Sequence, residues 1–200
     1  MFTIHDLSIP PYKLLINKKL SFVTIKFQPW MNAYFFSDLN TNGIVNLAVN
    51  NKDLELLHQA IFEEEDVMTR LQMIYGYIEK HEVTFTDKMK FVKSICEYIY
   101  NRKGKISVNE LCLQFNKTRQ YMNRVFKSEV LYSLKSFIIT VRILDLVKFK
   151  IKNEGITLTQ LSYEYGYFDQ SHFIRDFKRV CGVTPKTFFK SPSEFILRHK

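Results

Sequence analysis

The C-terminal half of the chain contains an internal repeat, which limits the possible folds more than any other feature of the sequence. The segment "FKSEVLYSLKSF" at residues 126–137 aligns with "FKRVCGVTPKTF" at residues 177–188 at a constant offset of 51 residues. Upstream, residues 106–107 align with residues 156–157 at an offset of 50. One residue is therefore gained in the intervening turn, where a change in length leaves the flanking helices intact.

Each copy of the repeat has the pattern of a short helix, a turn and a second helix. In the first copy we expect a supporting helix over residues 109–115 and a turn at residues 116–117. Thr118 would then cap a second helix that runs to residue 127, because Thr is a good N-cap residue.

The second copy has the same order of elements. Thr157 or Thr159 opens the supporting helix, and Gly166 supplies the turn. Asp169 is the expected cap of a second helix that runs to residue 180. The repeat therefore predicts two helix-turn-helix motifs, at residues 106–127 and 156–178.

The second helix of each copy divides into an apolar face and a polar, basic face. The residues expected to be buried are Met122, Phe126, Val130, Phe173, Phe177 and Val180. The residues on the outward faces are Gln120, Asn123, Arg124 and Lys127 in the first copy and Gln170, Ser171, Ile174, Arg175 and Lys178 in the second. Arg suits guanine, Gln and Asn suit adenine, Ile suits the thymine methyl group, and Lys suits the phosphate backbone. Two helices in matching register therefore indicate DNA binding.

The charge of the chain is unevenly distributed. Residues 1–86 hold 7 Lys and Arg against 10 Asp and Glu, a net charge of −3. Residues 87–200 hold 22 against 10, a net charge of +12. A basic half joined to a mildly acidic half indicates that only the basic half meets a polyanion, although charge alone does not exclude a solvated basic surface.

The second copy, "LSYEYGYFDQSHFIRDFKRVCGVTPKTF", resembles the signature of the AraC/XylS family of bacterial transcriptional regulators. The matching residues are Gly166, Phe173, Arg175, Phe177, Lys178, Gly182, Thr184, Pro185 and Phe188. The resemblance covers residues 87–190. In the first copy the chain departs from the family, because Leu131 and Leu134 stand where the family often has Gly and Pro.

The resemblance implies a seven-helix, all-α DNA-binding domain over residues 83–190, with a linker helix at residues 134–151 between the two motifs. The two recognition helices would enter successive major grooves about 34 Å apart. The implied base-reading residues are Gln120, Asn123, Arg124, Gln170, Ser171, Ile174 and Arg175. The implied phosphate contacts are Thr118, Lys127 and Lys178.

The front part, residues 1–82, has the pattern of a small α+β domain. Two apolar runs flank residues 17–19 and are typical of a hairpin, and helical periodicity begins at residue 51. The aromatic segment at residues 27–36 suits a ligand pocket, a dimer interface or a domain core. The resemblance implies a companion domain that senses a small molecule or dimerises, and the helix at residues 66–80 is a candidate for dimerisation. Residues 191–200 form a C-terminal tail.

The sequence thus predicts a mainly α, sequence-specific transcriptional regulator that binds double-stranded DNA. The alternative is a protein-interaction module that keeps the fold without reading DNA sequence. We expect no enzyme, cofactor or metal, because no phosphate-binding loop, metal-ligand spacing or activated nucleophile is recognisable. Three separated cysteines and the lack of an apolar run of ~18 residues predict a cytoplasmic, nucleoid-associated protein with no membrane segment. RNA polymerase is an expected partner if the protein activates transcription.

Overall fold

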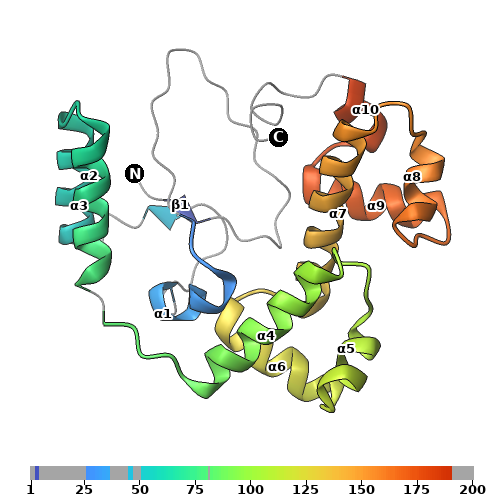
Figure 1. Ribbon diagram of the computed structural model, residues 1–200, viewed down its shortest axis with the longest axis horizontal. Helices are drawn as coiled ribbons and strands as arrows, with labels where there is room; N and C mark the ends of the chain where they lie inside the picture. The colour runs from blue at the N-terminus through green and yellow to red at the C-terminus, as the bar shows by residue number, and fades with distance from the viewer. Residues whose placement is uncertain (1–2, 5–25, 37–44, 47–50, 81, 191–200) are drawn as a thin grey trace. The chain divides into compact units, whose positions relative to one another are not determined.

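The structure is a computed structural model that describes residues 3–4, 26–36, 45–46, 51–80 and 82–190. These residues are mainly helical, which confirms the expected predominance of α structure (Figure 1). They belong to two compact units: residues 3–4, 45–46, 51–80 and 82–86 form unit 1, and residues 26–36 and 87–190 form unit 2. No helix in the described ranges is long and apolar enough to cross a bilayer.

Unit 1 contains two helices that lie side by side (Figure 1). Helix α2, Lys52–Glu63, begins after Asn51, whose side-chain oxygen accepts a hydrogen bond from the Leu54 amide at 3.1 Å. Helix α3, Val67–Glu79, begins after Asp66, whose carboxylate accepts one from the Thr69 amide at 2.7 Å. Each cap satisfies an N–H group that the helix itself leaves unpaired.

The strands of unit 1 are very short. Strand β1, Thr3–Ile4, pairs antiparallel with β2, Val45–Asn46, and each described strand has two residues. The α+β domain expected for residues 1–82 is therefore not supported by the described residues, because so short a ladder presents no face on which a core can form. The hairpin expected around residues 17–19 lies outside the described residues.

Unit 2 contains a first core that surrounds the first helix-turn-helix motif. Helices α4, Asp87–Asn101, α5, Val108–Phe115, and α6, Arg119–Val130, pack together with the 3₁₀ turn η1, Pro29–Met31, and helix α1, Asn32–Phe36. The Trp30 ring joins this core, and the Asn32 amide donates a hydrogen bond to the Val130 carbonyl at 3.0 Å. Part of the aromatic segment at residues 27–36 thus packs on α4 and α6, which nothing in the sequence pattern indicated.

A second core surrounds the second motif. Helix α7, Leu134–Lys152, leads from the first core to the second, where it packs with α8, Leu158–Glu164, α9, Gln170–Cys181, and α10, Pro185–Lys190. The α7 side chains in the first core are Leu134, Phe137, Ile138 and Val141. Those in the second core are Ile139, Ile143, Leu146 and Val147. The linker helix therefore contributes to both cores.

Both supporting helices begin with the same reciprocal capping box. Before α5, the Ser107 hydroxyl accepts from the Glu110 amide at 3.2 Å, and the Glu110 carboxylate accepts from the Ser107 amide at 2.8 Å. Before α8, Thr157 and Gln160 exchange equivalent bonds at 3.2 and 2.9 Å. Each box satisfies two free N–H groups, so the repeat at offset 50 is a repeat of helix starts. Of the two candidates, Thr157 is the cap.

The two recognition helices are also capped as expected. The Thr118 hydroxyl accepts a hydrogen bond from the Tyr121 amide at 3.2 Å at the start of α6. The Asp169 carboxylate accepts one from the His172 amide at 2.8 Å at the start of α9. The preceding turns need a left-handed residue, and Asn116 (φ 48°) and Gly166 (φ 72°) supply it. Asn and Gly are the residues that adopt this conformation most readily.

The end of α6 is strained where the end of α9 is not. Leu131 and Gly182 occupy equivalent left-handed positions, with φ of 60° and 76°. Their amides donate to the Lys127 and Lys178 carbonyls at 3.0 and 2.8 Å. Leu131 therefore keeps the turn that the family usually makes with Gly, but its Cβ adds a steric cost of about 1–2 kcal/mol.

We expect Leu131→Gly to raise the free energy of unfolding by about 1 kcal/mol, because Gly adopts positive φ without this cost. Leu131 is 44% exposed, so the truncation sacrifices little burial. Urea denaturation of the purified protein measures the change. Leu134→Gly is the matched control: this side chain is fully buried, and its loss should cost about 3 kcal/mol or more. A fall in stability for Leu131→Gly would contradict the strain argument.

The close approach of helix α7 explains why residue 104 is a glycine. Gly104, with φ of 67°, ends the turn after α4, and a Cβ built on it would lie 2.5 Å from the Arg142 backbone nitrogen and 2.7 Å from the Ile138 carbonyl oxygen. Backbone atoms of a packed helix do not move aside cheaply, so only Gly fits between the turn and α7.

Three Gly→Ala variants in unit 2 separate backbone strain from close approach. We expect Gly155→Ala to change the unfolding free energy by less than about 0.5 kcal/mol, because it has neither positive φ nor a neighbour within 4 Å. Gly166→Ala carries strain alone and should cost about 1 kcal/mol. Gly104→Ala combines strain with overlap and should cost about 3 kcal/mol. Equal effects at residues 104 and 166, measured by denaturation, would rule out the overlap.

Candidate nucleic-acid interface

Helix α6 exposes the residues of its expected outward face, which form a stripe along the helix. Its apolar face is buried, with Met122 and Phe126 at 0% exposure and Val130 at 3%. The side chains of Gln120, Asn123, Arg124 and Lys127 are all exposed. The Arg124 guanidinium lies 5.8 Å from the centre of the Tyr121 ring, and this cation–π contact helps to hold the Arg124 side chain in place on the exposed face.

Helix α9 presents an equivalent stripe. Phe173 and Phe177 are 1% and 0% exposed and hold the helix in the second core, while Val180 is half-buried. The side chains of Gln170, Ser171, Ile174, Arg175 and Lys178 are exposed. The structure thus places all the outward residues of both helices on the surface, although their roles toward DNA stay predictions.

Two residues of the expected interface also accept or donate side-chain hydrogen bonds within the fold. The Gln170 amide donates to the Thr159 hydroxyl of α8 at 2.6 Å, which ties the recognition helix to its supporting helix. This bond leaves the Gln170 side-chain oxygen and its second amide hydrogen free. Thr118 uses its oxygen as the α6 cap, and its hydroxyl hydrogen remains available to a phosphate.

The start of α9 carries a close pair of a carboxylate and an imidazole. The imidazole Nδ1 of His172 lies 3.2 Å from the Asp169 carboxylate, and both side chains are substantially exposed. The backbone amide of His172 lowers the pKa of Asp169, and the nearby imidazole adds to this effect. An ionised carboxylate at a helix N-terminus interacts favourably with the helix dipole. His172 therefore lies beside the cap, where it can donate to a phosphate when protonated.

The second motif exposes an aromatic residue that the sequence analysis did not assign to either face. Phe168 directly precedes the Asp169 cap and is 94% exposed. Lys117 precedes the Thr118 cap in the first motif and is likewise exposed. The signal was present in the sequence, because Phe168 falls outside the i, i+4, i+7 spacing of the buried residues Phe173, Phe177 and Val180.

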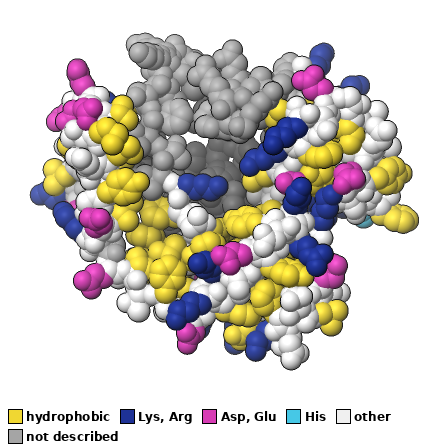
Figure 2. Space-filling view, in the orientation of Figure 1, with side chains coloured by type: hydrophobic (Ala, Val, Ile, Leu, Met, Phe, Trp, Pro, Cys, Tyr) yellow, Lys and Arg dark blue, Asp and Glu magenta, His cyan; other side chains and the backbone are white. Residues whose placement is uncertain are grey.

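The basic residues of unit 2 are largely unneutralised. Figure 2 shows Lys and Arg side chains gathered along α7 and near its junction with α4 on the face drawn. The ion pairs between Lys or Arg and an acid in the described residues involve Lys90, Lys93 and Lys105. Arg124, Lys127, Arg175 and Lys178 make no ion pair with a described residue, so their charge is available to an anionic partner.

The cysteines and the metal-ligating side chains of the described residues are the groups that a reactive thiol or a metal-binding site would need. No group of three His, Cys, Asp or Glu side chains within them is arranged to hold a metal ion. Burial raises the pKa of Cys96 and of Cys181 to about 12 in each case, so both thiols stay protonated and inert near neutral pH.

Comparisons with known proteins found one domain family and two curated relatives. The sequence model of a helix-turn-helix domain family matches residues 111–191. The Msm operon regulatory protein of Streptococcus mutans is 25% identical over 101 residues, which is 50% of this chain and 36% of that protein. The uncharacterised HTH-type transcriptional regulator YdiP of Escherichia coli is 25% identical over 130 residues, 64% of this chain and 40% of that protein. The chain therefore spans well under half the length of these relatives. No solved structure matches it.

Proposed function

We propose that the chain is a sequence-specific, DNA-binding transcriptional regulator of the AraC type, since residues 111–191 match a helix-turn-helix domain family and the relatives are named as regulators. One observation carries the proposal: α6 and α9 bury equivalent Phe residues and expose matching stripes of amide, Arg and Lys side chains. Each helix would enter a major groove, which is wide enough to admit an α-helix.

We assign the stripes two roles. Gln120, Asn123 and Arg124 of α6 and Gln170, Ser171, Ile174 and Arg175 of α9 would read bases. Thr118, Lys127 and Lys178 would contact phosphates. The division follows chemistry, because Arg and amide groups form paired hydrogen bonds with base edges, whereas the Lys ammonium is a point charge that suits the backbone.

The alternative of an interaction module without DNA reading gains no support from the described residues. This alternative was considered because Leu131 and Leu134 stand where the family often has Gly and Pro. Leu131 nevertheless adopts the left-handed turn, and Leu134 is buried at the first position of α7. Both features keep the first motif in the form that the second motif shows.

The remaining partners are also proposals. We place the protein in the cytoplasm, on double-stranded DNA, with RNA polymerase as a partner if it activates transcription. A homodimer through unit 1 is supported by exposed apolar side chains on its helices, including Val67, Met68 and Tyr75, each 63% exposed. A small-molecule effector remains a prediction. The helix-turn-helix family is a non-enzymatic, DNA-binding class, and we assign the chain no reaction.

Selection of bound sequences from random duplex DNA tests the function. We expect purified full-length protein, at near-physiological salt, to enrich two boxes about 10 base pairs apart, because successive major grooves on one face have that spacing. A single enriched box would show that one motif reads bases. Salt-sensitive binding without any enrichment would contradict the proposal and favour the interaction module.

Arg175→Ala and Lys178→Ala distinguish base reading from phosphate contact on α9. We expect the Arg175 change to cost about 1–3 kcal/mol on the selected site and to relax specificity at one position of one box. The Lys178 change should weaken all sequences about equally and reduce the slope of log K against log salt by about one. Arg124→Ala serves as the matched variant for the other box.

Titrations with selected and random duplexes over several salt concentrations provide both quantities. Arg124, Arg175 and Lys178 are exposed, so thermal unfolding of the variants should be unchanged. Equal losses of affinity on selected and random DNA from the Arg175 change would contradict base reading by this residue.

A further inference from the structure

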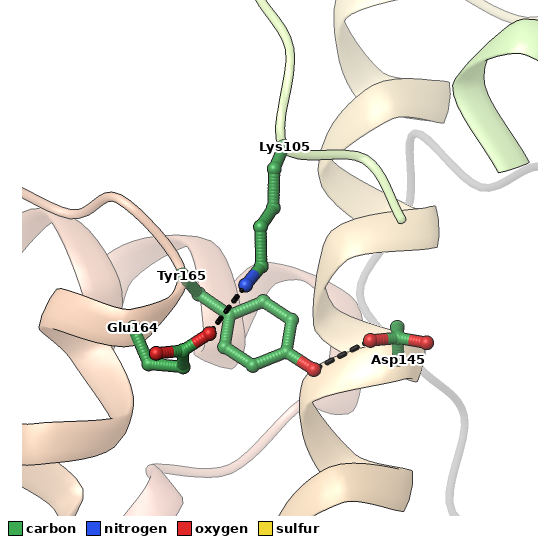
Figure 3. Close-up of polar contacts among 4 residues, drawn as sticks. All are labelled: Lys105, Asp145, Glu164 and Tyr165. Atoms are coloured by element: carbon green, nitrogen blue, oxygen red, sulfur yellow. Dashed lines mark hydrogen bonds and ion pairs between the residues drawn. The ribbon is translucent and has the colours of Figure 1, made fainter. Parts of the chain in front are cut away.

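A polar cluster joins the two helix-turn-helix motifs directly (Figure 3). The Lys105 ammonium, from the loop between α4 and α5, lies 2.8 Å from the Glu164 carboxylate at the end of α8. The same ammonium lies 4.4 Å from the centre of the Tyr165 ring. The Tyr165 hydroxyl donates to the Asp145 carboxylate of α7 at 2.5 Å. Lys105 thus lies directly before the first motif, and its two contacts, Glu164 and Tyr165, belong to the second.

The loop that carries Lys105 is itself fastened to α7. The Arg142 guanidinium donates to the Gly104 carbonyl at 2.7 Å and to the Ile106 carbonyl at 3.1 Å. These bonds hold the backbone on both sides of Lys105. Gly104 lies against the α7 backbone too closely for any side chain. The direction in which Lys105 leaves the loop is therefore set by α7.

Tyr165 is held from two sides. It is 2% exposed, and burial together with the bond to Asp145 raises the pKa of its phenol, so the hydroxyl remains a donor. Asp145 and Arg142 are neighbours on α7, three residues apart. The loop, the end of α8 and α7 consequently form a closed ring of contacts through Arg142, Lys105, Tyr165 and Asp145.

For each motif, residues of this ring lie next to the segment that positions the recognition helix. Lys105 is two residues before Ser107, which caps the supporting helix of the first motif. Tyr165 directly precedes Gly166, whose turn leads into α9. An open groove of about 540 Å³ separates the two motifs here, with Lys105 and Tyr165 in its lining. Contacts that span the groove, in addition to α7 itself, therefore restrain one motif against the other.

We propose that Lys105, Glu164 and Tyr165 are positioning residues that set the spacing between the two DNA boxes that the protein accepts. The inference rests on the proposed function. One inserted base pair moves the second box by about 3.4 Å and rotates it by about 35°, so a rigid pair of motifs loses contacts in one box. A pair released from the cluster can reorient and keep more of them.

Two variants that change the net charge in opposite directions test this role. Lys105→Met and Glu164→Gln each break the ion pair, whereas the first removes a positive charge and the second removes a negative one. Electrostatics alone predicts that they shift overall DNA affinity in opposite directions. The positioning role predicts that both change the dependence on spacing in the same direction. Tyr165→Phe removes the bond to Asp145 and keeps the ring.

The measurement is the dissociation constant for duplexes with the two selected boxes at their preferred spacing and with one base pair inserted or removed. For the wild type, the ratio of altered to preferred spacing should be large. We expect this ratio to be about threefold to tenfold smaller in Lys105→Met, which loses the ion pair and the cation–π contact. In Glu164→Gln, which loses the ion pair alone, we expect it to be about twofold to fivefold smaller. Lys88→Met, an exposed change on α4 that removes the same charge, should keep the wild-type ratio.

The outcomes of this measurement separate the positioning role from misfolding, from a general charge effect and from the proposed function. The Lys105 and Glu164 side chains are 34% and 52% exposed, so both variants should fold, and thermal unfolding checks this. Wild-type spacing ratios in both variants would overturn the positioning role and leave the proposed function standing. A wild-type protein that binds every spacing equally would overturn the positioning role, whereas the proposed function fails only if the selection enriches no box. Relaxed spacing in Lys88→Met as well would attribute the effect to charge and overturn the positioning role.

Discussion

The arrangement of the two motifs depends on one helix that belongs to two hydrophobic cores. Helix α7 has 19 residues, a length of about 28 Å, which is close to the ~34 Å between successive major grooves on one face of DNA. Its first turns fill the first core, and its later turns fill the second. Neither motif can rotate about α7 without exposing buried side chains. The polar ring around Lys105 adds a directional restraint that apolar packing lacks, because hydrogen bonds and ion pairs depend on angle and distance.

The sequence allowed most of the local structure of unit 2 to be predicted, because its signals act over three or four residues. The caps Thr118 and Asp169, the left-handed turn at Gly166 and the buried Phe177 all follow from short-range stereochemistry and helical spacing. Both supporting helices begin at the repeated capping box. The repeat also strengthens the prediction of two helix-turn-helix motifs, since a pattern that arises by chance in one helix is not expected again in the same register in a second helix.

The rest depended on contacts between distant residues and could not be predicted. Trp30 packs in a core otherwise formed by residues beyond 90, and Lys105 meets Glu164 across 59 positions. No local pattern indicates which lysine among many makes such a pair. In residues 1–82 the apolar runs that suggested an α+β domain were a weak signal, because short apolar segments suit strands and buried helices equally. The exposed Phe168 was not assigned from the sequence, although it falls outside the helical spacing of the buried residues of α9.

The use of acidic residues in unit 2 explains how one small domain is both stable and strongly basic. Glu110 and Asp169 cap helices, and hydrogen bonds to Ser107 and to the His172 amide respectively lower their pKa values. Glu164 pairs with Lys105, and Asp145 accepts from Tyr165. These acids thus serve helix ends and the contact between motifs. The Arg and Lys side chains on the outward faces of α6 and α9 form no ion pair with the described acids, so the fold is stabilised without neutralising the positive potential that attracts DNA.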